Sequence, residues 1–240
     1  MKNIVAFWGY PDPEILKNEI AKNPNCEIID LDVDYGYPIS GVMCEAYCKI
    51  IANIMNNAIF LRDKIKVIVA SIGKEKCDSG HIAAILLKDM GFNVIETKYE
   101  TYSHKASPTV ISESNLPLKD KIDLIMQGVY KKNNLTLTPA VPEVGFWGVP
   151  PNDFELLELF PDSTHVFGWT RCVEANRPAD LELEMMVNPN LPTVFFTQTF
   201  CAKMQLAKYL ADKYNGLFID VDDKVNKSAK AKIEAFIKLR

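Results

Sequence analysis

The sequence has no long apolar run, no excess of basic residues and none of the common nucleotide-binding signatures. No apolar stretch approaches the ~20 residues of a membrane-spanning helix, so we expect no membrane as a partner. The net charge of -4 and the pI near 5.5 argue against nucleic acid, because phosphate binding favours a basic face. Neither G-x-G-x-x-G nor a P-loop occurs, so nothing in the sequence points to a nucleotide.

The sequence also lacks a C-x-x-C pair, and we expect no signal peptide. Without C-x-x-C, neither a zinc ribbon nor a thioredoxin motif is supported. The first eight residues go directly into an apolar strand, so we expect a cytoplasmic protein. In that compartment a disulfide framework is not expected. The cysteines are then buried small hydrophobes, redox groups or metal ligands. There are six of them: Cys26, Cys44, Cys48, Cys77, Cys172 and Cys201.

What is present is an ordinary globular composition and an internal repeat. The chain has 240 residues, 48% hydrophobic and 24% charged, which allows one large domain or two small ones. Val144-Gly-Phe-Trp-Gly-Val-Pro150 matches Val5-Ala-Phe-Trp-Gly-Tyr-Pro11. After each of these segments, strands and helices are expected to alternate.

Each half reads as βαβαβαβα. Strands are predicted at residues 2–8, 27–33, 66–72 and 92–96, and again at 144–147, 165–169, 193–199 and 217–221. Helices are predicted at residues 14–21, 41–62, 79–90 and 118–130, and again at 154–160, 181–187, 201–214 and 228–239. Ser40 is the expected cap of the helix over 41–62.

Alternation at this spacing predicts parallel sheets with right-handed crossovers. The fold class is therefore α/β, with two similar Rossmann-like (flavodoxin-like) domains. Each would hold a four-stranded parallel sheet, and a pseudo-twofold would relate them. We expect an N-terminal domain over residues 1–132, a linker over 133–142 and a C-terminal domain over 143–240.

Three cysteines fall just beyond predicted strands: Cys77, Cys172 and Cys201. Ligands bind at the carboxyl ends of strands in open α/β sheets. If the two sheets face each other, these thiols would converge in an interdomain cleft, and soft thiolates there suit an iron–sulfur cluster or zinc. Neighbouring helix N-termini would favour the thiolate. The alternative is that all three are unlinked buried thiols.

Four more residues are candidate cofactor contacts. Trp8 and Trp147 end the first strand of each half and are predicted to wall a cleft or to pack under loops. Arg171 is a candidate anion contact or the partner in an exposed salt bridge. His81 would share a helix face with Cys77, as a ligand, a proton donor or a solvated histidine.

Several weaker signals remain open. Cys44 and Cys48 are spaced i, i+4 at a predicted helix start, as second-site ligands or core. Cys26 is expected in the core. The acidic strand end would hold a hard cation or a ribose hydroxyl, or form a solvated turn, and it comprises Asp30, Asp32 and Asp34. His104 lies in a long polar loop, and such loops are often functional lids.

The second half resembles the C-terminal domain of the 2-hydroxyacyl-CoA dehydratase and benzoyl-CoA reductase family, which includes double-cubane cluster proteins. Five segments carry the resemblance: Gly148-Val-Pro150 with Phe154-Glu-Leu-Leu-Glu-Leu159, the strand leading to Cys172, Phe195-Phe-Thr-Gln-Thr-Phe-Cys201, Ile219-Asp-Val-Asp222 and Lys232-Ile-Glu-Ala-Phe-Ile237. In the first half, Cys77-Asp-Ser79 is similar to the family's cysteine before a helix.

The resemblance implies two Rossmann-like domains that hold a [4Fe–4S] cluster through Cys77, Cys172 and Cys201. It implies a redox or dehydratase-like protein of anaerobic metabolism, as a lyase or a reductase component. We expect a small-molecule substrate and a partner subunit or electron donor. The chain is shorter than typical members and shows no helical insert for a CoA substrate.

Two other functions are carried forward. Glu75-Lys-Cys-Asp-Ser-Gly80, with the later Gly91-Phe-Asn-Val94, resembles the corrinoid-binding motif D-x-H-x-x-G. That resemblance implies a cobalamin carrier for methyl transfer with Cys77 near cobalt. The remaining alternative is a metal-free module that binds a small molecule and uses its cysteines for packing.

Overall fold

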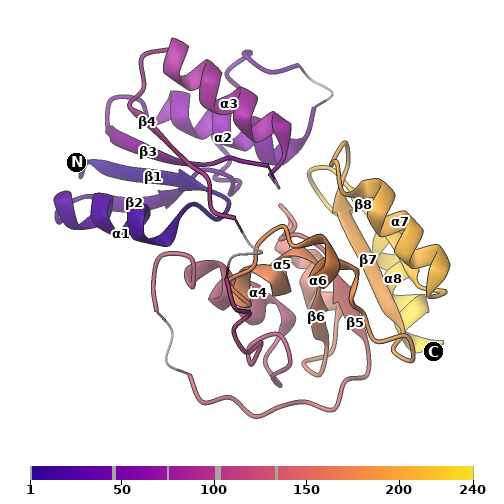
Figure 1. Ribbon diagram of the computed structural model, residues 1–240. Helices are drawn as coiled ribbons and strands as arrows, with labels where there is room; N and C mark the ends of the chain where they lie inside the picture. Colours follow the sequence, from indigo (N-terminus) through magenta and orange to yellow (C-terminus); the bar gives the residue numbers. More distant parts are fainter. Residues whose placement is uncertain (1, 45–46, 75, 101–103, 133–134, 240) are drawn as a thin grey trace. The chain divides into compact units, whose positions relative to one another are not determined.

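The computed structural model describes residues 2–44, 47–74, 76–100, 104–132 and 135–239 (Figure 1). Contacts divide the chain into two compact units, Met1–Glu100 and Thr101–Arg240, and each is described by itself. Each unit is built around a four-stranded sheet in which all paired strands run parallel. The predicted α/β class with two Rossmann-like sheets is therefore confirmed.

The first unit has the strand order β2-β1-β3-β4. Its strands are β1 (Ile4–Trp8), β2 (Glu27–Asp30), β3 (Ile65–Ser71) and β4 (Val94–Thr97). Its helices are α1 (Pro13–Lys22), α2 (Lys49–Phe60) and α3 (Asp78–Asp89). Helices α2 and α3 lie on one face of the sheet and α1 on the other (Figure 1).

The central strands β1 and β3 are buried on both faces, as parallel strands between helix layers must be. Alternate residues, among them Ala6, Trp8 and Ile68, join the core under α2 and α3. The first helix begins where the sequence indicates. Asp12 accepts hydrogen bonds from the first-turn backbone N–H groups, and Pro13 follows at the first helical position, a favourable combination at a helix start.

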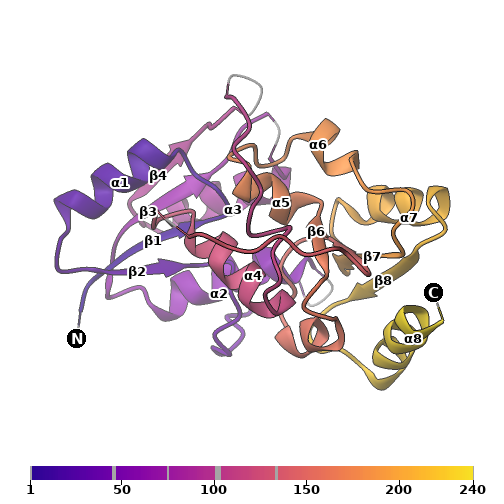
Figure 2. The ribbon, with the colours of Figure 1, turned by 90° about the horizontal axis from the view of Figure 1, so that it is seen from below.

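The second unit has the matching order β6-β5-β7-β8. Its strands are β5 (Gly145–Trp147), β6 (His165–Phe167), β7 (Thr193–Gln198) and β8 (Leu217–Val221). Its helices are α4 (Leu118–Gln127), η2 (Phe154–Leu159), α5 (Trp169–Glu174), α6 (Leu181–Met185), α7 (Met204–Lys213) and α8 (Lys227–Lys238), which Figure 2 shows from a second direction.

Strand residues in this unit alternate between two apolar layers. Trp147 and Phe195 pack with α7, whereas Phe146 and Phe196 stack on the other face, where Phe160 at the end of η2 meets Phe146 edge-on. Gly168 has a φ of 72°, and a Cβ there would lie 2.9 Å from the Gly148 nitrogen. Only glycine fits this close crossing between the β5 and β6 ends.

The division between the units falls earlier than the sequence pattern indicates. Helix α4 belongs to the second unit, where it packs against α5 and η2. Its Lys121 is fully buried and donates to the Asp162 and Thr164 carbonyls at 2.8 and 2.5 Å. These bonds tie α4 to the segment before β6, so the first compact unit ends at residue 100, whereas the sequence-based domain extends to 132.

The helix predicted over residues 41–62 is wrong in its first third. Helix α2 begins only at Lys49, with Cys48 as its N-cap. Gly41 has a φ of 73°, which interrupts helical backbone, and Ser40 donates from both its N–H and its hydroxyl to the Asn56 side-chain oxygen instead of capping a helix. Residues 45 and 46 lie outside the described part of the chain.

Within the described ranges, no helix combines the length and apolarity needed to cross a membrane.

Candidate functional site

Cys77 lies at the carboxyl end of β3, as the N-cap of the 12-residue helix α3. Its side chain is exposed, and it makes no side-chain capping hydrogen bond to the helix. The backbone N–H groups of a first turn, together with the helix dipole, favour a negative charge at this position. The geometry therefore presents the Cys77 sulfur to solvent beside the N-terminal end of α3.

Cys201 lies at the corresponding edge of the second sheet, three residues after β7 ends at Gln198. The turn passes through Phe200, whose φ of 60° is rare for a bulky residue. Cys201 is half-buried, and its Sγ accepts a hydrogen bond of 3.5 Å from the backbone N–H of Lys203. Since β3 and β7 occupy the same place in the two strand orders, Cys77 and Cys201 are equivalent in the repeat.

Cys172 lies differently from the prediction of a loop beyond a strand. Strand β6 ends at Phe167 and α5 begins at Trp169, so Cys172 is inside a helix and is fully buried. Its Sγ is 3.9 Å from the Asp180 carbonyl oxygen. Burial, followed by the negative charge of Glu184, raises the pKa of this thiol well above its usual range. The structure thus holds Cys172 as a neutral packed thiol.

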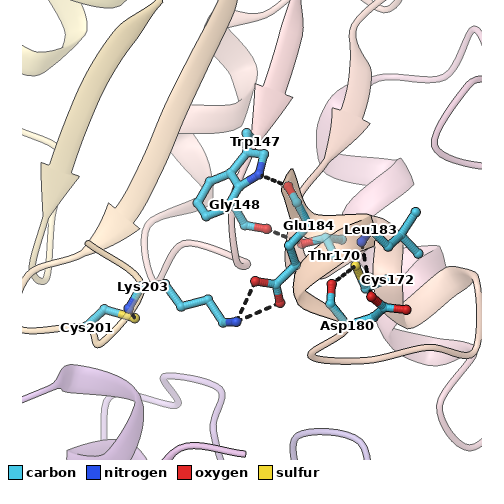
Figure 3. Close-up of polar contacts among 9 residues, drawn as sticks. All are labelled: Trp147, Gly148, Thr170, Cys172, Asp180, Leu183, Glu184, Cys201 and Lys203. Atoms are coloured by element: carbon cyan, nitrogen blue, oxygen red, sulfur yellow. Dashed lines mark hydrogen bonds and ion pairs between the residues drawn. The ribbon is translucent and has the colours of Figure 1, made fainter. Parts of the chain in front are cut away.

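A partly buried ion pair lies between Cys201 and Cys172 (Figure 3). The Lys203 Nζ is 2.5 and 2.7 Å from the two carboxylate oxygens of Glu184. Glu184, on α6, has no exposed surface, and its backbone carbonyl accepts a 2.6 Å hydrogen bond from the Trp147 indole. Lys203 and Glu184 are not among the residues predicted from the sequence. Nothing in the local pattern marks Glu184, because a short helix gives too few residues to separate its buried face.

The two tryptophans are both fully packed at the ends of β1 and β5. Trp147 uses its indole N–H, as described above. The Trp8 indole N–H is buried near Gly80 in the first turn of α3, and it has no hydrogen-bond partner among the described residues. Both rings therefore belong to the core beneath the sheet edges that carry Cys77 and Cys201.

Arg171 acts as a cap for α6. Its Nη2 donates to the backbone carbonyls of Leu183 and Met186, both at 2.5 Å, and its guanidinium lies over the Phe167 ring. These bonds hold the α6 segment that carries Glu184. His81 is exposed in the first turn of α3, four residues after Cys77.

The segment before α2 runs beside the start of α3. The Tyr47 hydroxyl donates to the Ser79 hydroxyl at 3.0 Å, which joins this segment to the residue two places after Cys77. Cys44 is exposed and Cys48 is half-buried at the edge of the core. Cys26, just before β2, is also half-buried. Because of the Tyr47 bond, the first unit has accessible thiols on two neighbouring segments.

The acidic strand end forms a coupled pair. Asp32 accepts a hydrogen bond from the Gly9 N–H at 2.9 Å, and its own N–H donates to Asp30 at 3.3 Å. Burial raises the pKa of both carboxyls, and for Asp30 the neighbouring Asp32 charge adds to the shift. Asp34 accepts from Gly36 in an exposed turn. The pair ties the β1–α1 turn to the end of β2.

Within the described ranges, no three histidine, cysteine, aspartate or glutamate side chains are arranged to hold a metal ion. Cys77 belongs to the first unit, and Cys172 and Cys201 belong to the second. His104 is exposed in the segment before α4. Glu75, part of the corrinoid-like motif, lies outside the described residues.

Because comparisons with known proteins found no match, a functional argument depends on the fold and on these side chains. No protein-family model matches the chain, and no curated protein matches it. The class that can be stated is therefore structural: an α/β protein with two Rossmann-like parallel sheets of the same strand order. In each, an accessible cysteine lies at the carboxyl end of the third strand in that order.

Proposed function

We propose that this protein binds a [4Fe–4S] cluster and that Cys77 and Cys201 are two of its ligands. The supporting observation is their equivalence: each is an accessible thiol between a parallel strand and a helix, in sheets of the same order. The backbone N–H donated to the Cys201 sulfur is of the kind that stabilises cluster thiolates.

The three predicted cysteine ligands differ in how readily each could bind a cluster. The Cys77 side chain is exposed and the Cys201 side chain is half-buried, and both lie at or just before helix starts, so they need less rearrangement than Cys172 to take a ligand. Cys172 would have to leave the core of α5 and lose its proton. Cys44 is exposed, on the segment that Tyr47 joins to the start of α3. We therefore propose Cys44 as the alternative to Cys172 for the third ligand.

A cluster with one iron free of cysteine would supply a Lewis acid or a one-electron carrier. The proposal accordingly includes a small-molecule substrate and a partner subunit or electron donor, in a redox or dehydratase-like reaction. All six cysteines are free, in keeping with the reducing cytoplasm, where we place the protein.

The test is metal analysis with a visible spectrum on protein reconstituted and kept without oxygen. We expect brown protein with roughly four irons per chain. Cys77→Ser and Cys201→Ser should each lower the iron content and alter the spectrum, whereas Cys26→Ser, the matched control, should leave both unchanged. Comparing Cys44→Ser with Cys172→Ser identifies the third ligand.

Colourless protein without iron after anaerobic reconstitution would overturn the proposal. A visible spectrum that changes instead on adding cobalamin, and does so in the wild type but not in Cys77→Ala, would favour the corrinoid carrier. If serine replacement at residues 77, 172 and 201 lowers stability without changing any bound group, the metal-free binding module is the better description.

A further inference from the structure

The ion pair between Lys203 and Glu184 carries a large desolvation cost. The Glu184 side chain is fully enclosed, whereas 28% of the Lys203 side chain is exposed. Removing two charges from water usually costs as much as their attraction returns, so an apolar pair of the same size would be as stable or more so. Stability alone therefore does not explain why these two charges lie here.

The position of the pair suggests another reason. Lys203 is the N-cap of α7 and follows Cys201 by two residues. Its backbone N–H donates to the Cys201 sulfur, while its side chain extends to Glu184 on α6 (Figure 3). The pair thus fixes an ammonium group at the carboxyl edge of the second sheet, the edge at which ligands bind in this fold class.

The two charges of the pair are not equally visible from solvent. The Glu184 side chain is enclosed, whereas the Lys203 side chain is partly exposed, so solvent reaches the cationic partner and not the carboxylate. The ten-residue helix α7 begins beside it, and a helix N-terminus adds positive potential. An ammonium carries three N–H donors, and the contacts to the two Glu184 oxygens use two of them.

We propose that the ligand of the Cys201 site is an anion, bearing a carboxylate or phosphate group that the Lys203 ammonium binds beside the sulfur. Glu184 is the positioning residue, which holds the ammonium in place. This inference deepens the proposed function, on which it rests for the role of Cys201 as a ligand site. The charge selectivity itself belongs to the polypeptide and can be measured without a cluster.

The experiment compares two thiol reagents on the metal-free full-length chain. The Cys201 thiolate displaces iodide from iodoacetate or iodoacetamide and forms one S–C bond in each case, so the reagents undergo the same reaction and differ in charge, while a reference thiol corrects for their unequal intrinsic reactivity. Tandem mass spectrometry gives the two rates at Cys201, and their ratio cancels accessibility and thiol pKa. Cys44, exposed in the other unit, is the internal reference.

We expect the iodoacetate-to-iodoacetamide ratio at Cys201 to exceed that at Cys44. Glu184→Gln, which leaves the ammonium uncompensated, should raise the ratio about threefold, since losing one nearby negative charge close to a surface changes the interaction with an anion by about one RT. The double variant Lys203→Met with Glu184→Met removes both charges without stranding either, and should lower the ratio to that of Cys44.

A Cys201 ratio that stays equal in the wild type, Glu184→Gln and the double variant would overturn the inference. If the single glutamine variant fails to fold, the double variant still decides, because its apolar pair fills the same space. If the protein binds iron but the reagent ratio at Cys201 is the same in the wild type and both variants, the anion site is contradicted and the cluster proposal is not. If the reagent ratio at Cys201 changes in the variants as expected but the protein never binds iron, the cluster proposal is contradicted and the anion site is not.

Discussion

The indole N–H of Trp147 donates a 2.6 Å hydrogen bond to the backbone carbonyl of Glu184, whereas the indole N–H of Trp8, at the same place in the first sheet, is buried without a partner among the described residues. The repeat therefore provides its own matched pair for measuring a buried hydrogen bond. Trp147→Phe removes the indole donor from a buried carbonyl, while Trp8→Phe removes a donor that has no partner among the described residues.

We expect Trp147→Phe to lower the free energy of unfolding by about 1–2 kcal/mol more than Trp8→Phe does, since the loss of a buried hydrogen bond costs about that much beyond the lost ring area. Urea unfolding followed by circular dichroism measures both. Equal losses in the two variants would show that the Trp147 bond contributes no net stability.

Thiol labelling of the metal-free native chain should separate the cysteines by their environments. Cys44 and Cys77 are exposed and should react first. Cys172 is fully buried with a raised pKa, so it should react on the order of 100-fold more slowly, after local opening. Mass spectrometry of timed samples gives the order. Labelling of Cys172 as fast as Cys77 would contradict its packing inside α5.

Asp30→Asn should change how stability depends on pH. A carboxyl whose folded pKa is raised binds more protons in the folded state than in the unfolded one. Its contribution is therefore favourable at low pH and is lost as pH rises from the unfolded value near 3.8 through the raised folded pKa. Asparagine keeps an oxygen acceptor for the Asp32 N–H and removes the repulsion.

We expect Asp30→Asn to be about 1 kcal/mol more stable than the wild type at neutral pH, and to show a flatter pH profile above pH 4. Thermal unfolding at several pH values measures this difference. Asp63→Asn, in an exposed turn, serves as the control and should follow the wild-type profile. If Asp30→Asn is instead less stable than the wild type at neutral pH, then ionising both Asp30 and Asp32 in the folded state does not destabilise the protein.

Lys121 should make the free energy of unfolding rise with pH in the alkaline range, which is the opposite of the trend expected from Asp30. Burial lowers the pKa of its ammonium to about 8 despite its bonds to two carbonyls. The unfolded chain, with a lysine pKa near 10.4, then binds more protons between pH 8 and 10.4. Over that window the stability contributed by Lys121 rises with pH, and it is constant below it.

The corresponding measurement is the difference in unfolding free energy between the wild type and Lys121→Met from pH 7 to 10.5. We expect this difference to move in favour of the wild type above pH 8. Lys119→Met, on the exposed side of α4, should show no such trend. A difference that is flat across the whole range would place the Lys121 pKa at its ordinary value.

The alternation of apolar strands with helices carried the fold prediction, because parallel strands buried on both faces have an unmistakable composition. The segments that begin at Val5 and Val144 also identified the repeat. They contain β1 and β5, which come first along the chain in their sheets and hold the same place in the two strand orders. Local signals were weaker around Ser40. Asn56, sixteen residues away, binds Ser40, and no sequence window shows such a long-range partner.

The candidate site was predictable where it depends on topology and unpredictable where it depends on packing. A cysteine just after a strand had to fall at the sheet edge, and Cys77 and Cys201 do. The burial of Cys172 depends on α5 starting directly at Trp169, after the glycine at position 168. The Lys203–Glu184 pair joins α6 to α7 across the intervening strand β7, and charges that far apart in sequence give no periodic pattern.

Separate expression of the two halves will depend on α4. A gene cut after residue 132 would leave Leu118, Ile122 and Ile125, all buried in the intact chain, as an unprotected apolar stripe on the first fragment. The second fragment would lose the cover over η2 and α5. Both products would tend to aggregate through these faces, whereas a cut after residue 100 leaves each sheet with its full complement of helices.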